Sequence, residues 1–109
     1  MITIPVKIKR EDKVIMIRLL ENVISYMSDF LNINNIISYE VCTDILSKLR
    51  ASQHNDKAIR INIIQVGFFF ETLKIYSNIG LYEQTNADII LGQMKKEIHK
   101  RTNQLYRTT

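Results

Sequence analysis

The side chains that most often perform catalysis are few in this sequence of 109 residues. It contains one cysteine, Cys42, and two histidines, His54 and His99. Nucleophilic catalysis needs a serine or cysteine held against a base. Cys42 falls on the apolar spacing of an expected helix, whereas His54 falls in a polar loop and His99 in a lysine-rich stretch. We therefore expect Cys42 to be a core residue, and nothing in the spacing pairs it with a base.

Metal and cofactor sites are equally hard to find. A zinc site needs three or four Cys, His or acidic ligands at short spacing, which two isolated histidines do not supply. Glu40 and Asp44 lie one helical turn apart and could bind a cation weakly, although such a pair is more often a solvated helix face. The sequence holds no glycine-rich phosphate loop and none of the common hydrolase or metalloprotease motifs. It therefore predicts a protein that is not an enzyme, with no cofactor, no metal and no small-molecule substrate.

Positive charge is concentrated at one end of the chain. Residues 1–92 hold equal numbers of basic and acidic residues, so the net charge of +4 falls within residues 93–109. The candidate contacts for nucleic acid or an acidic partner are Lys95, Lys96, His99, Lys100, Arg101 and Arg107. A short glycine-containing turn does not precede them, so any nucleic acid should be bound through non-specific backbone contacts. The alternative is a solvated helix end, because the helix dipole favours cations there.

Three consecutive phenylalanines, Phe68, Phe69 and Phe70, give the strongest packing signal. At about 100° per residue they cover a wide arc of a helix. A helix that is apolar around most of its circumference is usually surrounded by other elements, so we predict that residues 64–78 form the central helix. Either the strands and the loop around Tyr82 complete its cover, or a second copy of the chain does.

The elements that must position these residues follow from the apolar spacing. Residues 2–8 alternate apolar and polar side chains and predict a strand, which Pro5 limits to an edge or a short pairing. Residues 57–62 fit either a strand or the first turns of a helix. Steps of three and four predict helices, the second of them capped by Ser38, over about 12–31, 39–51, 64–78 and 86–106.

A weak internal repeat relates the two halves of the chain. "VKIKRED" (6–12) and "IRINIIQ" (59–65) share an apolar–basic–Ile–polar start, lead into apolar helices and are 53 residues apart. If the repeat is real, the chain is strand–helix–helix twice, and the two strands can pair with each other. The alternative is that both are unrelated isoleucine-rich helix entrances.

Size and composition bound the fold. A chain of this length, 46% hydrophobic and 24% charged, fits one domain over 1–109. We predict a mainly α fold, a four-helix bundle-like domain with one or two short β-strands at about 2–8 and 58–62. The lone cysteine and the lack of an apolar leader predict a cytoplasmic protein. The longest apolar stretch, 61–70, is too short to cross a membrane.

Two functional predictions remain. The leading one is a small non-enzymatic helical protein that acts through protein–protein contacts, with itself as the favoured partner and Phe68, Phe69 and Phe70 as core or self-association anchors. The alternative is a non-specific nucleic-acid-binding protein that uses the basic C-terminal helix. The isoleucine- and asparagine-rich sequence with its basic end would suit a small accessory protein of a phage or mobile element.

Overall fold

The computed structural model describes residues 2–78 and 84–108, with side chains described for residues 2–78 and 88–103. The described chain forms a two-stranded sheet and four helices. Their order is β1 (Thr3–Val6), α1 (Arg10–Ser28), α2 (Ile36–Ala51), β2 (Ile59–Asn62), α3 (Ile63–Asn78) and α4 (Gln84–Thr108). The prediction of a mainly helical, bundle-like fold with short strands is confirmed.

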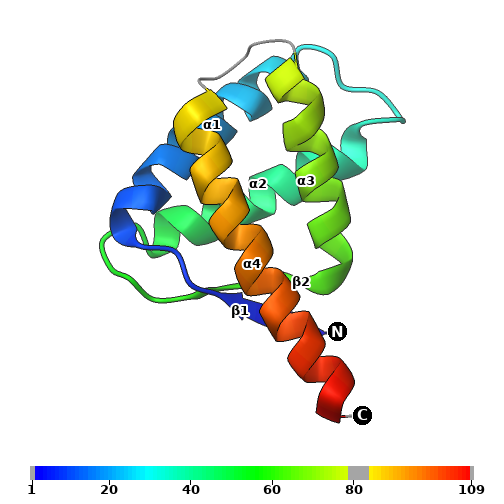
Figure 1. Ribbon diagram of the computed structural model, residues 1–109. Coiled ribbons are helices and arrows are strands. Elements are labelled where there is room, and N and C mark those ends of the chain that lie inside the picture. Colours follow the sequence, from blue (N-terminus) through cyan, green and yellow to red (C-terminus); the bar gives the residue numbers. More distant parts are fainter. Residues whose placement is uncertain (1, 79–83, 109) are drawn as a thin grey trace.

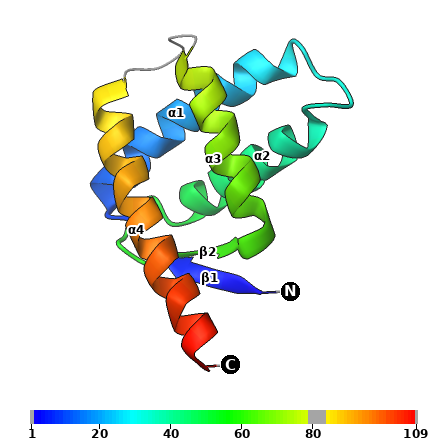
Figure 2. The same ribbon diagram turned by 45° about the vertical axis from the view of Figure 1, so that its right-hand side comes forward.

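The helices form two layers above the sheet. In Figures 1 and 2, α3 and α4 cross in front of α1 and α2, and the sheet lies at the lower end. α1 packs on α2, α3 packs on α2 and β2, and α4 packs on β1 and α1. The order strand–helix–helix occurs twice along the chain, as the internal repeat predicted.

The two strands pair with each other in antiparallel register, Ile4 opposite Ile61 and Val6 opposite Ile59. All four side chains are buried, so one face of the sheet closes the end of the core. The ambiguous segment at 57–62 is therefore a strand, because its alternating isoleucines meet those of β1. The repeat's prediction that the two strands pair is confirmed.

The free edges of this small sheet are occupied by side chains. The amide of Ile63 donates to the Ile2 carbonyl, and bonded pairs alternate along an antiparallel ladder, so Pro5 and Thr3 direct their backbone groups outward. Pro5 has no amide hydrogen to offer there, and the Arg60 guanidinium donates to the carbonyl and hydroxyl oxygens of Thr3. On the other edge, Lys48 Nζ donates to the Arg60 carbonyl at 2.7 Å. One outward-facing carbonyl on each strand, that of Thr3 and that of Arg60, is therefore already bonded.

The core is built from all six elements, and its members share near-complete burial. It includes Met16, Leu20, Val23 and Met27 of α1; Val41, Cys42, Ile45 and Leu49 of α2; Phe69 and Leu73 of α3; and Ile90, Met94 and Ile98 of α4. For α1 and α2, the steps of three and four that predicted the helix thus also identified the face that it buries.

The connection between α1 and α2 differs from the prediction. α1 ends at Ser28, earlier than expected, because asparagine amides bond to the backbone of the loop that follows it. Asn35 donates through Nδ2 to the Phe30 carbonyl and accepts from the amide of Asn32. Such local bonds compete with helix continuation. α2 then begins at Ile36, so the prediction of a cap at Ser38 is wrong.

Within the described ranges, the chain contains no helix long and apolar enough to cross a membrane. The loop around Tyr82 that was expected to help cover α3 lies outside the described residues.

Candidate functional site

The three adjacent phenylalanines of α3 point to three different environments. Phe69 is 1% exposed and belongs to the core. Phe70 is half-buried and packs edge-to-face on Phe69, with ring centroids 5.6 Å apart. Phe68 is 43% exposed. One residue of the triplet therefore anchors the fold, and another is left for solvent or a partner.

Phe68 belongs to a longer apolar row on the outer side of α3. Ile64, Phe68 and Ile75 follow steps of four and seven, which place them on one side of the helix; we call them the α3 stripe. Their exposed fractions are 71%, 43% and 53%. The described part of the chain leaves this side of α3 open, so the described strands and helices do not cover it by themselves.

A second group of exposed apolar side chains lies where α1 passes to α2. We call it the loop patch, and it consists of Phe30, Leu31, Ile33, Ile36 and Ile37. Phe30 and Leu31 were expected to extend the buried face of α1. They are exposed because the helix ends at Ser28 and the asparagine bonds redirect the chain.

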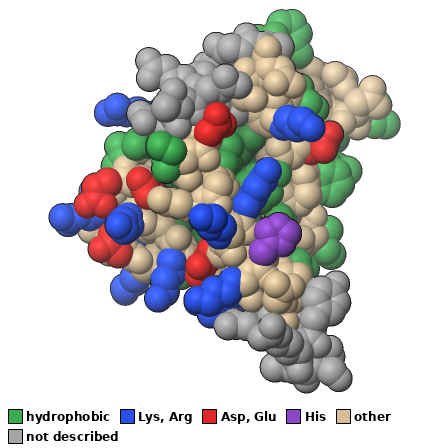
Figure 3. Space-filling view, in the orientation of Figure 1, with side chains coloured by type: hydrophobic (Ala, Val, Ile, Leu, Met, Phe, Trp, Pro, Cys, Tyr) green, Lys and Arg blue, Asp and Glu red, His purple; other side chains and the backbone are tan. Residues whose placement is uncertain are grey.

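Aromatic contacts link the loop patch to α3. The ring of Tyr26 lies 5.2 Å from that of Phe30 and 5.5 Å from that of Tyr76 on α3. Burial raises the pKa of Tyr76, so its hydroxyl remains neutral in this apolar setting. Figure 3 shows hydrophobic side chains along the right-hand margin, over α3 and the α1–α2 loop, and most charged side chains elsewhere. The α3 stripe and the loop patch together form what we call the apolar edge.

A groove separates α3 from α4 on the neighbouring side of α3. Its volume is about 430 Å³. Its apolar lining includes Phe70 and Leu91, its charged lining is Glu71, Lys74, Asp88 and Lys95, and a glycine lies on each helix, Gly67 and Gly92. No described atom would lie within 4 Å of a Cβ at either glycine. Gly92 therefore does not mark a close helix crossing among the described residues.

The basic residues of α4 are partly free and partly engaged. Lys96, His99 and Lys100 are exposed. Lys95 is also exposed but holds its ammonium 5.3 Å from the centre of the Phe70 ring, a cation–π contact. Arg101 is partly buried and pairs with Glu97 at 3.4 Å. The side chain of Arg107 lies outside the described residues. Of the six predicted contacts, Lys96, His99 and Lys100 are therefore the three that are exposed to solvent and available to a partner.

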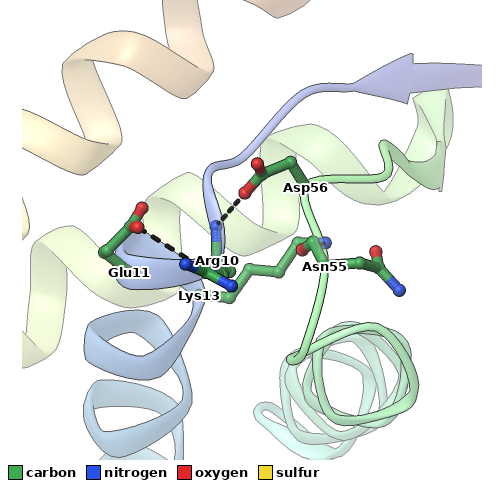
Figure 4. A network of polar contacts seen from close by, with 5 residues as sticks. All are labelled: Arg10, Glu11, Lys13, Asn55 and Asp56. Carbon is green, nitrogen blue, oxygen red and sulfur yellow. Dashed lines mark hydrogen bonds and ion pairs between the residues drawn. The ribbon is translucent and has the colours of Figure 1, made fainter.

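A buried polar junction around Lys13 was not predicted from the sequence. This lysine of α1 is 0% exposed, and its Nζ donates to the carbonyls of Ser52, Asn55 and Lys57 at 3.0, 2.9 and 2.7 Å. Nearby, Asp56 accepts from the amide of Arg10 at 2.9 Å and so caps α1 from the distant loop (Figure 4). One signal could have revealed its burial: Lys13 follows the same steps of three and four as the buried apolar residues of α1.

Lys13 is a structural cation rather than a nucleophile. Burial lowers its pKa, and the charge of Asp56 acts in the opposite direction. A buried lysine with a lowered pKa can mark a catalytic site. Here all three ammonium hydrogens are used to hold the loop after α2, which leaves none for a substrate.

The remaining candidates for chemistry are separated from one another. Cys42 is fully buried, and burial raises its pKa to about 12, as expected of a core thiol. Asp44 forms an ion pair at 3.2 Å with Lys48, one helical turn further along α2. Over the residues that the structure describes, His, Cys, Asp and Glu side chains form no group of three that could hold a metal.

Comparison with known proteins gives no function for this chain, so any proposal must rest on the surfaces described above. No family model matches the sequence, and searches of curated proteins and of solved structures returned no match.

Proposed function

We propose that this chain is a non-enzymatic helical protein that acts through protein–protein contacts and associates with itself through the apolar edge. The observation that carries the proposal is the open outer side of α3. Ile64, Phe68 and Ile75 line up there with more than two fifths of each side chain exposed. Contiguous apolar surface of this kind marks interaction sites more often than ordinary solvent-facing surface.

The size of the apolar edge supports the proposal. Its eight side chains are between 38% and 89% exposed. If each presents about 100 Å² of apolar surface, the edge offers roughly 800 Å², which is what one partner buries in a standard interface. A second copy always carries the same surface, and a two-fold interface joins a surface to itself. Apolar side chains can therefore meet apolar side chains without any other partner.

Light scattering coupled to size-exclusion chromatography tests the proposal. We expect a dimer or larger species at high micromolar concentration, and a shift toward the monomer in Phe68→Ala/Ile75→Ala. Val14→Ala is the matched control, because Val14 is 40% exposed on α1, away from the apolar edge. Phe69→Ala should instead cost about 3–5 kcal/mol of folding stability, since it empties a core position. A wild-type chain that remains monomeric throughout would refute self-association.

A second candidate function is non-specific nucleic-acid binding by α4, favoured by the exposed Lys96, His99 and Lys100. Phosphate contacts release counterions, so affinity should fall steeply with salt. We expect Lys96→Glu/Lys100→Glu to abolish binding of duplex DNA in a fluorescence-anisotropy titration. The control Arg18→Glu/Lys57→Glu changes the net charge equally at exposed sites outside α4 and should retain binding. Equal losses in both variants would show that net charge alone is responsible.

A further inference from the structure

The outer side of α3 carries two parallel rows of different chemistry. The apolar row is the α3 stripe. Beside it, toward α4, lies a second row formed by Gly67, Glu71 and Lys74, which lines the α3–α4 groove. Gly67 and Glu71 also line a smaller hollow with Ile64 and Phe68. The two rows are therefore continuous, and a partner that covers one must also meet the other.

When the α3 helices of two copies lie along each other, two-fold symmetry allows two ways for them to pack. The axis lies in the contact plane and runs either along the helices or across them. An axis along the helices makes them parallel and exchanges their sides, so each stripe faces the partner's charged row. An axis across the helices makes them antiparallel and leaves the stripe on the same side of the interface in both copies. Stripe then meets stripe, and charged row meets charged row.

Charge selects the antiparallel arrangement. In the parallel dimer the charged side chains of Glu71 and Lys74 are pressed against isoleucine and phenylalanine without a partner, which is costly. In the antiparallel dimer the charged row runs in the opposite direction on the second copy. The acid of one copy then lies beside the base of the other, and the pairing occurs twice because the interface is symmetric.

We propose, resting on the self-association above, that α3 packs antiparallel on α3 of a second copy. Phe68 lies opposite the partner's Ile75, and Glu71 pairs with the partner's Lys74 in both directions. In this register Glu71 and the partner's Lys74 are offset by two residues, or about 3 Å along the axis, which these side chains span. Gly67 has open space around it, so the backbone of the partner can approach closely there.

Cysteine cross-linking distinguishes the two arrangements. Single cysteines are placed at Glu71→Cys or Ile64→Cys in a Cys42→Ala background, and the protein is oxidised at a concentration where light scattering shows a dimer. The antiparallel register brings position 71 close to its own copy, whereas the two copies of position 64 are about 20 Å apart. We expect a disulfide-linked dimer for Glu71→Cys and at least tenfold less for Ile64→Cys. Efficient linkage at position 64 would establish a parallel dimer and overturn this inference while leaving self-association intact.

Charge exchange gives a second, independent readout by sedimentation. Glu71→Lys and Lys74→Glu each place like charges across the interface and should weaken dimerisation at least tenfold. The double variant Glu71→Lys/Lys74→Glu restores opposite charges and should recover the wild-type dissociation constant to within about threefold. Failure of the double variant to recover affinity, with its helical content unchanged, would overturn the proposed pairs. A wild-type protein that is monomeric would remove the proposed function and this inference together.

Discussion

The ammonium group of Lys13 joins the start of α1 to the loop that follows α2. Its three donors meet three backbone carbonyls, so a segment without helix or strand structure is held in one conformation. Burying a charge is costly unless it is fully bonded, and here the bonding capacity of the ammonium is filled. Lys13 thus stabilises the conformation of this loop through hydrogen bonds rather than through apolar packing.

We expect Lys13→Met to lower the free energy of unfolding by about 3 kcal/mol, because it leaves three carbonyls without a charged donor. Urea denaturation measures the change. Arg18→Met is the matched control, since Arg18 lies on the same helix with an exposed side chain, and a surface substitution should stay within about 0.5 kcal/mol. A similar small loss for Lys13→Met would show that water replaces the ammonium at little cost.

The buried thiol of Cys42 predicts a dependence of stability on pH. Its pKa is about 12 in the folded chain against an ordinary value of 9.0. Between these values the unfolded chain loses a proton that the folded chain keeps, so stability falls as pH rises. From pH 9 to 10 this one group should remove about 1 kcal/mol.

Urea denaturation of the wild type and of Cys42→Ala at pH 8, 9 and 10 isolates this contribution, because the other titrating groups are common to both chains. The stability difference between the two should be nearly constant up to about pH 8 and shrink above it, most steeply beyond pH 9. A difference that does not change with pH would mean that the thiolate is tolerated in the folded core.

At the scale of the elements, α3 and α4 each carry a glycine that the described fold does not require. Gly92 lies in the middle of α4 with open space where a side chain would be. Glycine inside a helix costs about 1 kcal/mol relative to alanine. We expect Gly92→Ala to raise the free energy of unfolding by about that amount in urea denaturation. A loss of stability would instead reveal a close contact at this position.

How far the elements could be predicted depended on how sharply their faces differ. α1 and α2 separate polar from apolar residues at steps of three and four, so their buried faces were evident. α3 is apolar nearly all round, and that pattern does not say whether a neighbouring element or another molecule provides the cover. The early end of α1 was missed because it depends on amide bonds from Asn35 to the backbone.

The same limit applied to the candidate sites. The shared helix face of Lys96 and Lys100 followed from helical spacing, and both are exposed. Arg101 was expected to be a free contact but pairs with Glu97. Lys13 occupies a buried helical position, but the carbonyls that it bonds lie 39 to 44 residues further along the chain. Spacing within one element identifies a face, whereas a contact of this kind depends on where a distant loop is placed.

At the scale of the whole molecule, self-association should link thermal stability to protein concentration. Folded copies that bind each other are stabilised by mass action. Above the dissociation constant, each tenfold rise in concentration should add about 0.7 kcal/mol per chain and raise Tm by about 3 °C. Scanning calorimetry over a concentration series measures this slope, and Phe68→Ala/Ile75→Ala should flatten it. A wild-type Tm that is independent of concentration would contradict the proposed dimer.

The pairing of β1 with β2 has a consequence for biosynthesis. A ribosome delivers β1, α1 and α2 before it delivers β2, so the nascent first half carries a lone strand and an ammonium group whose last acceptor has not been made. Contacts between segments so far apart in sequence form slowly, and incomplete domains with open strands are prone to aggregate. The chain can therefore reach its native fold only once its second half is being translated. A chaperone that binds the first half would act before that point.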